Sequence, residues 1–315
     1  MPLVRLLFAA LIIFASAQAS AQLLGSDQKI KIIAPFAAGG AVDQVARIVA
    51  NNMPDGGAIV DNRTGAGGDI GVTAAAKATP DGHTLLLHTS SYVINSTIRG
   101  KSKEIADAFE PLARVGAVKF VLVDRADLPV KSLAELIALA KSGKSLSYGS
   151  TGHGTTLHIA GEMLNDAAGI KAVHIPYRGL APAFTDILSG QIDYIITSVT
   201  GVLPYVQNGK VRALAVFETE RAEQLPDVPT TKELGFSELV LSNWYGIFTQ
   251  AAVPAAQRKE LENILMNVLR SPKVSEQLIA AGVTGPQNAA EFKKSVNADF
   301  ARWPALLNRI SVKFD

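Results

Sequence analysis

The hydrophobic pattern alternates between short β-branched or apolar runs and longer stretches with helical spacing. Residues 30–33 predict a strand, and the apolar residues at 42, 45, 46 and 49 then lie on one helix face. Similar short runs predict strands at 59–60, 84–88, 120–123, 146–148, 173–175, 194–196 and 211–216. Because strands and helices alternate, the pattern predicts an α/β fold with mostly parallel sheets and helices on both faces.

The last part of the chain is predicted to be mainly helical. Pro254 suits the first position of a helix, and apolar residues recur behind it at helical spacing. Another helix is expected to begin at Pro272, and the last near Glu291, with Pro304 kinking or ending it. Earlier in the chain, Ser132 and Glu135 have the spacing of a capping box and predict a helix start.

A predicted strand at 244–248, placed just before these helices, is expected to return the chain to its first half. Two series of alternating strands and helices indicate two domains. The chain is expected to cross from the first domain to the second and later to return to the first. We predict a first domain at 28–124 and 243–315 and a second at 125–242, with the two crossovers forming a hinge.

Polar turns follow the predicted strands at 35–43, 62–71, 89–91, 149–156 and 197–201. Ligands of open α/β sheets bind outside the carboxyl ends of the strands. These turns carry few charged side chains and instead offer backbone N–H groups, hydroxyls and helix N-termini. Such a set suits a carboxylate held by neutral donors better than it suits catalysis.

The turn at 35–43 contains Gly39-Gly40 immediately before a predicted helix. Glycines let the main chain approach a ligand closely, and the free N–H groups and dipole of the helix favour an anion. Asp43 falls about where the third helical residue would lie. The alternatives are a tight strand-to-helix turn without a ligand and an acid that only stabilises the helix start.

The first 21 residues have the pattern of a signal peptide. Arg5 precedes an apolar run at 6–14 that is too short to span a bilayer, and Ala19-Ser20-Ala21 fits the small-x-small cleavage rule. Cleavage after Ala17 or Ala19 is an alternative. We therefore expect an exported, periplasmic protein. The chain has no cysteine, which excludes disulfides and Cys-based metal sites, and its formal net charge of +2 makes nucleic-acid binding unexpected.

No catalytic set is evident in the sequence, because a G-x-S-x-G nucleophile motif is missing. His153 and His158 are five residues apart, so they do not share a helix face, and no acid joins them at metal-ligand spacing; we expect no metal site. Gly65, Gly67 and Gly71 only superficially match a dinucleotide turn, because Asn62-Arg63-Thr64 separates them from the strand. No cofactor is expected.

Several motifs, in order along nearly all of the mature chain, resemble those of the Bug-type receptors of tripartite tricarboxylate transporters. They are Pro35-Phe-Ala-Ala-Gly-Gly-Ala-Val-Asp43, Asp61-Asn-Arg-Thr-Gly-Ala-Gly-Gly-Asp-Ile-Gly71, Ala78-Thr-Pro-Asp-Gly82, Leu146-Ser-Tyr-Gly-Ser-Thr-Gly-His-Gly-Thr155, His174-Ile-Pro-Tyr-Arg-Gly179, Gly209-Lys-Val-Arg-Ala-Leu-Ala215 and Leu225-Pro-Asp-Val-Pro-Thr230. His83 stands where this family usually has tyrosine, a difference that we expect to affect only packing.

The resemblance implies a type II periplasmic-binding-protein fold, with two α/β domains around a ligand cleft and a two-crossover hinge. It also implies that the first loop and the loop that opens the second domain hold a ligand carboxylate, partly through water. Carried over by position, the implied binding residues are Phe36, Gly39, Gly40, Ala41, Asp43, Gly67, Gly68, Thr89, Ser90, Ser150, Thr151, Gly154, Thr155, Thr197 and Ser198.

The implied function is capture of a small carboxylate in the periplasm and its delivery to the membrane permease of a tripartite tricarboxylate transporter. Tricarboxylates, dicarboxylates, amino acids and aromatic acids are all open as ligands, and the protein is expected to be a monomer and not an enzyme. One alternative is a secreted hydrolase of small esters or amides, because serine and histidine both occur within 147–158. Another is a ligand-sensing subunit with the same fold.

Overall fold

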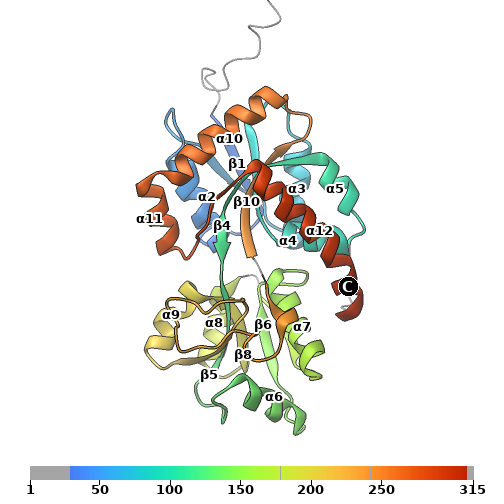
Figure 1. Ribbon diagram of the computed structural model, residues 1–315, viewed down its shortest axis with the longest axis vertical. Coiled ribbons are helices and arrows are strands. Elements are labelled where there is room, and N and C mark those ends of the chain that lie inside the picture. The colour runs from blue at the N-terminus through green and yellow to red at the C-terminus, as the bar shows by residue number, and fades with distance from the viewer. Residues whose placement is uncertain (1–28, 178, 242, 311–315) are drawn as a thin grey trace, which may run out of the picture.

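Two β-sheets lie one above the other along the long axis of the molecule (Figure 1). The computed structural model describes residues 29–310 except 178 and 242, so the predicted signal peptide at 1–21 lies outside the described residues. We call each sheet, with the helices that cover it, a lobe. The first lobe is the upper one in Figure 1, and the second lobe is the lower one.

The first lobe contains a six-stranded sheet in the order β11-β4-β10-β3-β1-β2. Its strands are β1 (Lys31–Ala34), β2 (Ile59–Asn62), β3 (Thr84–Thr89), β4 (Phe109–Val118), β10 (Asn243–Gln250) and β11 (Gln287–Asn288). The helices of this lobe are α2 (Ala41–Asn51), the 3-10 turn η1 (Ala66–Gly68), α3 (Asp69–Ala76), α4 (Ser91–Ile98), α5 (Ser102–Ala108), α10 (Ala255–Arg270), α11 (Pro272–Ala280) and α12 (Ala289–Ile310).

The second lobe contains a five-stranded sheet in the order β7-β6-β8-β5-β9. Its strands are β5 (Phe120–Arg125), β6 (Ser147–Ser150), β7 (Val173–Pro176), β8 (Tyr194–Ser198) and β9 (Val211–Val216). The helices are α6 (Leu133–Lys141), α7 (Thr156–Ala168), α8 (Leu180–Leu188), α9 (Val199–Gln207) and the 3-10 turn η2 (Ser237–Leu239).

Both sheets are mixed, so the prediction of mostly parallel sheets is wrong. In the first lobe β10 runs antiparallel to β3 and β4, and in the second lobe β5 runs antiparallel to β8 and β9. The antiparallel strands are the two that follow the crossovers: β5 enters the second sheet with only Lys119 between it and β4 of the first sheet, and β10 brings the chain back into the first sheet. As a result, the run at 120–123 pairs in the second sheet, although the predicted boundary places it in the first domain. The domain boundaries stay a prediction.

Alternate apolar residues of β5 are buried on opposite faces of the second sheet. Phe120 and Leu122 join a buried cluster that extends through the first lobe, while Val121 and Val123 join a second cluster on the other face of the second sheet. Successive side chains of a strand point to opposite faces, which explains this division. The second sheet is therefore covered on both faces, and one of its cores is continuous with that of the first lobe.

Two local predictions have different outcomes. The helix start predicted at Ser132 is confirmed, because Ser132 Oγ accepts a hydrogen bond from the Glu135 backbone N–H (3.2 Å), while the Glu135 carboxylate accepts from the Lys131 N–H (2.6 Å), one residue before the N-cap. Of the two outcomes predicted for Pro304, the helix end is wrong, because α12 continues through it to Ile310, and the kink stays a prediction. Burial of the α12 face that carries Phe292 and Trp303 outweighs the local preference of proline.

Candidate functional site

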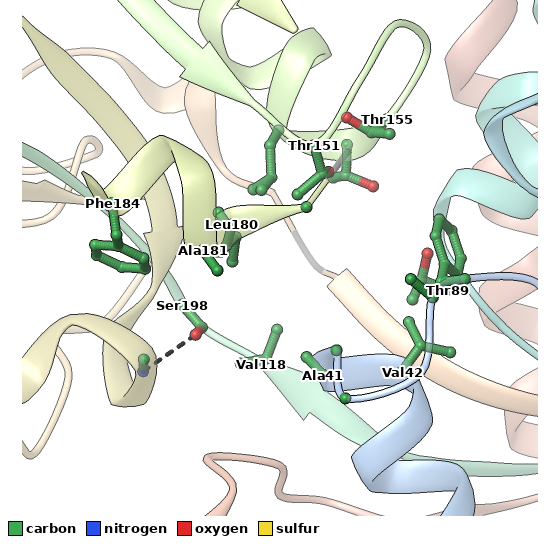
Figure 2. Close-up of a pocket in the computed structure, with 18 of the residues that line it drawn as sticks. Ala41, Val42, Thr89, Val118, Thr151, Thr155, Leu180, Ala181, Phe184 and Ser198 are labelled. Atoms are coloured by element: carbon green, nitrogen blue, oxygen red, sulfur yellow. Dashed lines mark hydrogen bonds between the residues drawn. The ribbon is translucent and has the colours of Figure 1, made fainter. Parts of the chain in front are cut away.

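A cleft of about 830 Å³ lies between the lobes, where strands of both sheets end (Figure 2). Among the described residues, the lining contains no Asp, Glu, Lys, Arg or His side chain. The polar groups that this part of the lining offers are backbone groups, hydroxyls and the Asn243 amide, all of them neutral.

The first-lobe wall is the turn between β1 and α2, from Phe36 to Val42. Gly40 is the N-cap of α2, and its N–H already donates to the Ala37 carbonyl (3.2 Å). Ala41 and Val42 are the first residues of the helix, so their N–H groups have no intrahelical acceptor. Both residues line the cleft (Figure 2). They supply the backbone donors of this wall, at the positive end of the α2 dipole.

Asp43 lies under this turn and is almost fully buried. One carboxylate oxygen accepts from the Gly39 N–H (2.9 Å) and from Arg47 Nε (2.8 Å), and the other accepts from Asn62 Nδ2 (2.9 Å). Burial alone would raise the pKa of the Asp43 carboxyl, but these hydrogen bonds outweigh burial and hold the pKa below its usual value. Asp43 therefore fixes the shape of the turn from beneath and is not part of the cleft lining.

The second-lobe wall carries hydroxyl groups at the ends of β6 and β8. Thr155 is the N-cap of α7 and its Oγ1 donates to the Gly152 carbonyl (2.8 Å), while Ser198 is the N-cap of α9. The Ser198 Oγ accepts from the Gly201 N–H (3.2 Å), the dashed line in Figure 2. Two further helix N-termini thus end at the cleft, opposite that of α2.

A network of hydroxyl groups joins the two lobes close to the cleft. Ser90 Oγ donates to Asn243 Oδ1 (2.7 Å) and lies 3.0 Å from Thr156 Oγ1, which is also 3.1 Å from Ser91 Oγ. Ser90 and Ser91 belong to the first lobe, and Thr156 opens α7 in the second. The network holds the start of α7 against the first lobe.

The structure brings about half of the sequence-predicted residues into the cleft lining. These are Phe36, Gly39, Gly40, Ala41, Thr89, Thr151, Thr155 and Ser198. The others lie outside it. Asp43 and Ser90 support it as described, Thr197 and Ser150 are fully buried, Gly67 borders a separate small cavity, Gly68 lies beside the His88 ring, and Gly154 lies beside the Asn95 side chain.

Sequence reasoning missed the apolar part of the cleft. This part comes mainly from α8 and the residues before it, namely Gly179, Leu180, Ala181, Pro182, Phe184, Thr185 and Leu188, together with Tyr205, Val118 and Phe120. Figure 2 shows Leu180, Ala181 and Phe184 on this side. The turn after β7 also follows the end of a strand, so the same rule would have found it.

Three histidines gather behind the turn at 150–156. His153 lies in the turn, His158 in the first part of α7 and His174 on β7, and one ring nitrogen of each lies within 4.8 Å of one from each of the others. Burial and the two neighbouring histidines lower the pKa of His158 to about 3, and burial and His153 lower that of His174 to about 4. Sequence spacing pointed only to His153 and His158. His174 joins them because β7 pairs in parallel with β6, a contact between distant segments that spacing does not reveal.

The fold and the cleft define a class of protein: a two-lobed α/β protein with a cleft between its lobes. Residues 44–312 match the family model described as "Tripartite tricarboxylate transporter family receptor". This chain belongs to that receptor family, which confirms the resemblance noted from its motifs. None of the described helices is long and apolar enough to cross a membrane.

Solved structures of similar proteins confirm the periplasmic-binding-protein fold. One described as the periplasmic binding protein BugD is 30% identical, has a TM-score of 0.81 and is matched over 91% of this chain and 99% of its own. MatC (Rpa3494) from Rhodopseudomonas palustris, with bound malate, is 27% identical with a TM-score of 0.80 over 89% and 98% of the two chains. R. palustris Rpa4515, with adipate, is 26% identical with a TM-score of 0.83 over 91% and 98%.

Proposed function

We propose that this protein captures a small carboxylate in the cleft and delivers it to the permease of a tripartite tricarboxylate transporter. The observation that carries the proposal is the cleft itself, in which the N-terminus of α2 meets hydroxyl groups and the described lining residues carry no charged side chain. A ligand carboxylate would accept from the Ala41 and Val42 N–H groups and from hydroxyls such as those of Thr151 and Ser198.

The apolar wall of α8 complements this polar end. A ligand with a carboxylate at one end and methylene groups behind it would match both, since Leu180, Phe184 and Leu188 line the far side. Malate and adipate, which are bound in two of the similar structures, are the first probes to use. A ligand at a hundred times its dissociation constant stabilises the folded state by about 2.7 kcal/mol, so a thermal-shift screen of carboxylates will detect binding.

The family and the signal-like N-terminus support a periplasmic location. In that compartment the receptor would act as a monomer, load its ligand and dock on the permease. No catalysis, metal or cofactor is needed for this function.

Substitution of Gly40 tests the anion site. Gly40 has φ −81°, which any residue adopts, and aspartate is a good N-cap, so Gly40→Asp is expected to fold normally. Its carboxylate would occupy the helix N–H groups and repel the ligand, so carboxylate affinity should fall by more than about tenfold, or 1.4 kcal/mol.

Gly40→Asn is the matched control, because it adds nearly the same atoms at the same place without the charge. Its added Cβ meets the same neighbour, the Ala37 carbonyl oxygen at 3.2 Å. Calorimetry should show a much larger loss for Gly40→Asp than for Gly40→Asn. Near-normal affinity in Gly40→Asp would place the anion site elsewhere.

One observation favours the hydrolase alternative, namely that Ser150 Oγ lies 2.6 Å from His174 Nε2. Against it, Ser150 is fully buried and does not line the cleft, so a substrate would not reach its hydroxyl. Incubation with model esters distinguishes the two functions. We expect no turnover above background, and turnover that disappears in Ser150→Ala would replace the receptor function with an enzymatic one.

A further inference from the structure

The cluster of His153, His158 and His174 is built from three segments that tertiary structure brings together. His174 faces the β6 residue Tyr148 in the parallel register of β6 and β7, and the rings of His158 and His174 stack with centroids 4.0 Å apart. The His153 ring meets that of His174 edge-on at 4.9 Å. His153 is exposed and His158 is buried, so the cluster leads from the surface toward the interior.

We propose that these three histidines form a site for a divalent transition-metal ion such as Zn²⁺. Histidine nitrogens are standard ligands of this ion, and three of them with one open position make a common coordination set. Ligand nitrogens about 2.0–2.1 Å from a tetrahedral ion lie about 3.3 Å from one another. In this structure all of them lie within 4.8 Å of one another, so small side-chain movements are enough to reach that spacing.

Metal binding would change one particular hydrogen bond. The Gly154 N–H donates to His158 Nδ1 (3.2 Å), which requires a lone pair on that nitrogen. If the ion binds Nδ1, this lone pair is used. If the ion binds Nε2, the single proton of the neutral ring moves to Nδ1, which then cannot accept. In either case the Gly154 N–H loses this partner.

The site is therefore coupled to the cleft. Gly154 lies in the turn that also carries Thr151 and Thr155, and both of these residues line the cleft. A bound ion would release the turn at Gly154 and alter the second-lobe wall. Ser150, whose hydroxyl is hydrogen-bonded to His174, would hold that ring in position at the start of the same turn.

Competition with a chromogenic chelator tests the site, using ZnCl₂ and the full chain prepared without a histidine tag. We expect one ion per chain. His153→Gln should lower the affinity for Zn²⁺ at least about tenfold. Substitution of a residue that only supports a metal ligand already costs about that much, and His153 is proposed to be a ligand itself. This variant keeps the test independent of folding because His153 is exposed, and His174→Gln should act in the same direction.

His83→Gln is the matched control, since His83 has a carboxylate nearby, Asp81 at 3.5 Å, but lies outside the cluster. Its affinity for Zn²⁺ should equal that of the unchanged protein. Absence of binding at micromolar Zn²⁺, or an equal loss in His83→Gln and His153→Gln, would overturn the site.

Amide NMR tests the coupling separately. Zn²⁺ should shift the Gly154 N–H resonance of the unchanged protein and leave it in place in His153→Gln at the same concentration. A Zn²⁺ complex in which the Gly154 resonance does not move would refute the link to the cleft. Neither experiment needs the carboxylate, so each can fail while the proposed receptor function stands.

Discussion

Asp43 places a negative charge at the helix end that is proposed to receive an anion, and its contacts explain how both can coexist. Its two oxygens together accept three hydrogen bonds from Gly39, Arg47 and Asn62. The charge is thus balanced by Arg47 and directed away from the cleft. An acid in this position shapes the turn and leaves the donors of Ala41 and Val42 available.

We therefore predict that Asp43→Asn keeps affinity for malate or adipate within about tenfold, or 1.4 kcal/mol. The variant should lose folding stability, because the amide nitrogen cannot accept from Arg47 or Gly39. Calorimetry and urea unfolding measure the two effects, and Asp61→Asn, an acid outside the cleft lining that pairs with Arg63, is the control. A large loss confined to amino-acid ligands would instead assign Asp43 to a ligand ammonium group.

At the scale of elements, β3 connects the core of the first lobe with the cleft. Leu85, Leu86 and Leu87 are fully buried between β1 and β10, and the strand ends at Thr89 in the lining. His88 lies at this transition, where its Nδ1 accepts from the Thr89 N–H (2.8 Å) and its ring packs edge-on against Phe36 (5.5 Å). The strand thus supports both the first-lobe turn and the floor of the cleft.

Burial lowers the pKa of His88 to about 4, below its value of 6.5 in the unfolded chain. The unfolded state therefore binds more protons between these values, and the stability that this group contributes is lost as the pH falls from about 6.5 to about 4. The slope near pH 5 is about 1 kcal/mol per pH unit. Urea unfolding at several pH values measures it.

His88→Asn is the comparison, because its side-chain oxygen replaces the Nδ1 acceptor but does not titrate. The variant should be less stable at every pH, owing to the smaller side chain, and should show a flatter dependence between pH 6.5 and 4. Parallel stability curves for the two proteins over this range would mean that His88 is protonated in the folded state.

At the scale of the whole molecule, the lobes touch on both sides of the cleft. Arg309 on α12 pairs with Asp166 on α7 (3.1 Å), and on the other side Thr200 Oγ1 of α9 donates to the Ala281 carbonyl after α11 (3.3 Å). The second contact is tight, because a Cβ built on Gly282 would lie 2.3 Å from Thr200 Oγ1. The lobes are therefore close enough that bulk added at this contact must separate them.

We predict that Thr200→Trp holds the lobes apart, so small-angle X-ray scattering should give a larger radius of gyration than for the unchanged protein. Thr200→Ser keeps the hydroxyl at this contact and should match the unchanged protein. Thr200 does not line the cleft, so weaker carboxylate binding in Thr200→Trp would report on lobe separation. An unchanged radius of gyration would show that the contact yields without moving the lobes.

The sequence by itself determined those features that depend on interactions between residues close together in the chain. The strand, turn and helix around Gly39-Gly40, the cap at Ser132 and the rule that polar turns follow strand ends all rest on interactions within a few residues. For this reason local patterns predicted the α/β class and an anion site at Gly39-Gly40, whereas Phe36 and Ala41 were implied by the family resemblance.

Tertiary structure decided what depends on pairing between distant segments. Antiparallel pairing of β5 and β10, continuation of α12 through Pro304 and the approach of His174 to His158 all arise from burial and strand registry. The residues next to a strand do not determine whether it pairs parallel or antiparallel. The residues next to a buried ring do not determine which ring it packs against. The strand-end rule could have found the turn after β7, but the packing of the two lobes decides that α8 presents apolar side chains to the cleft.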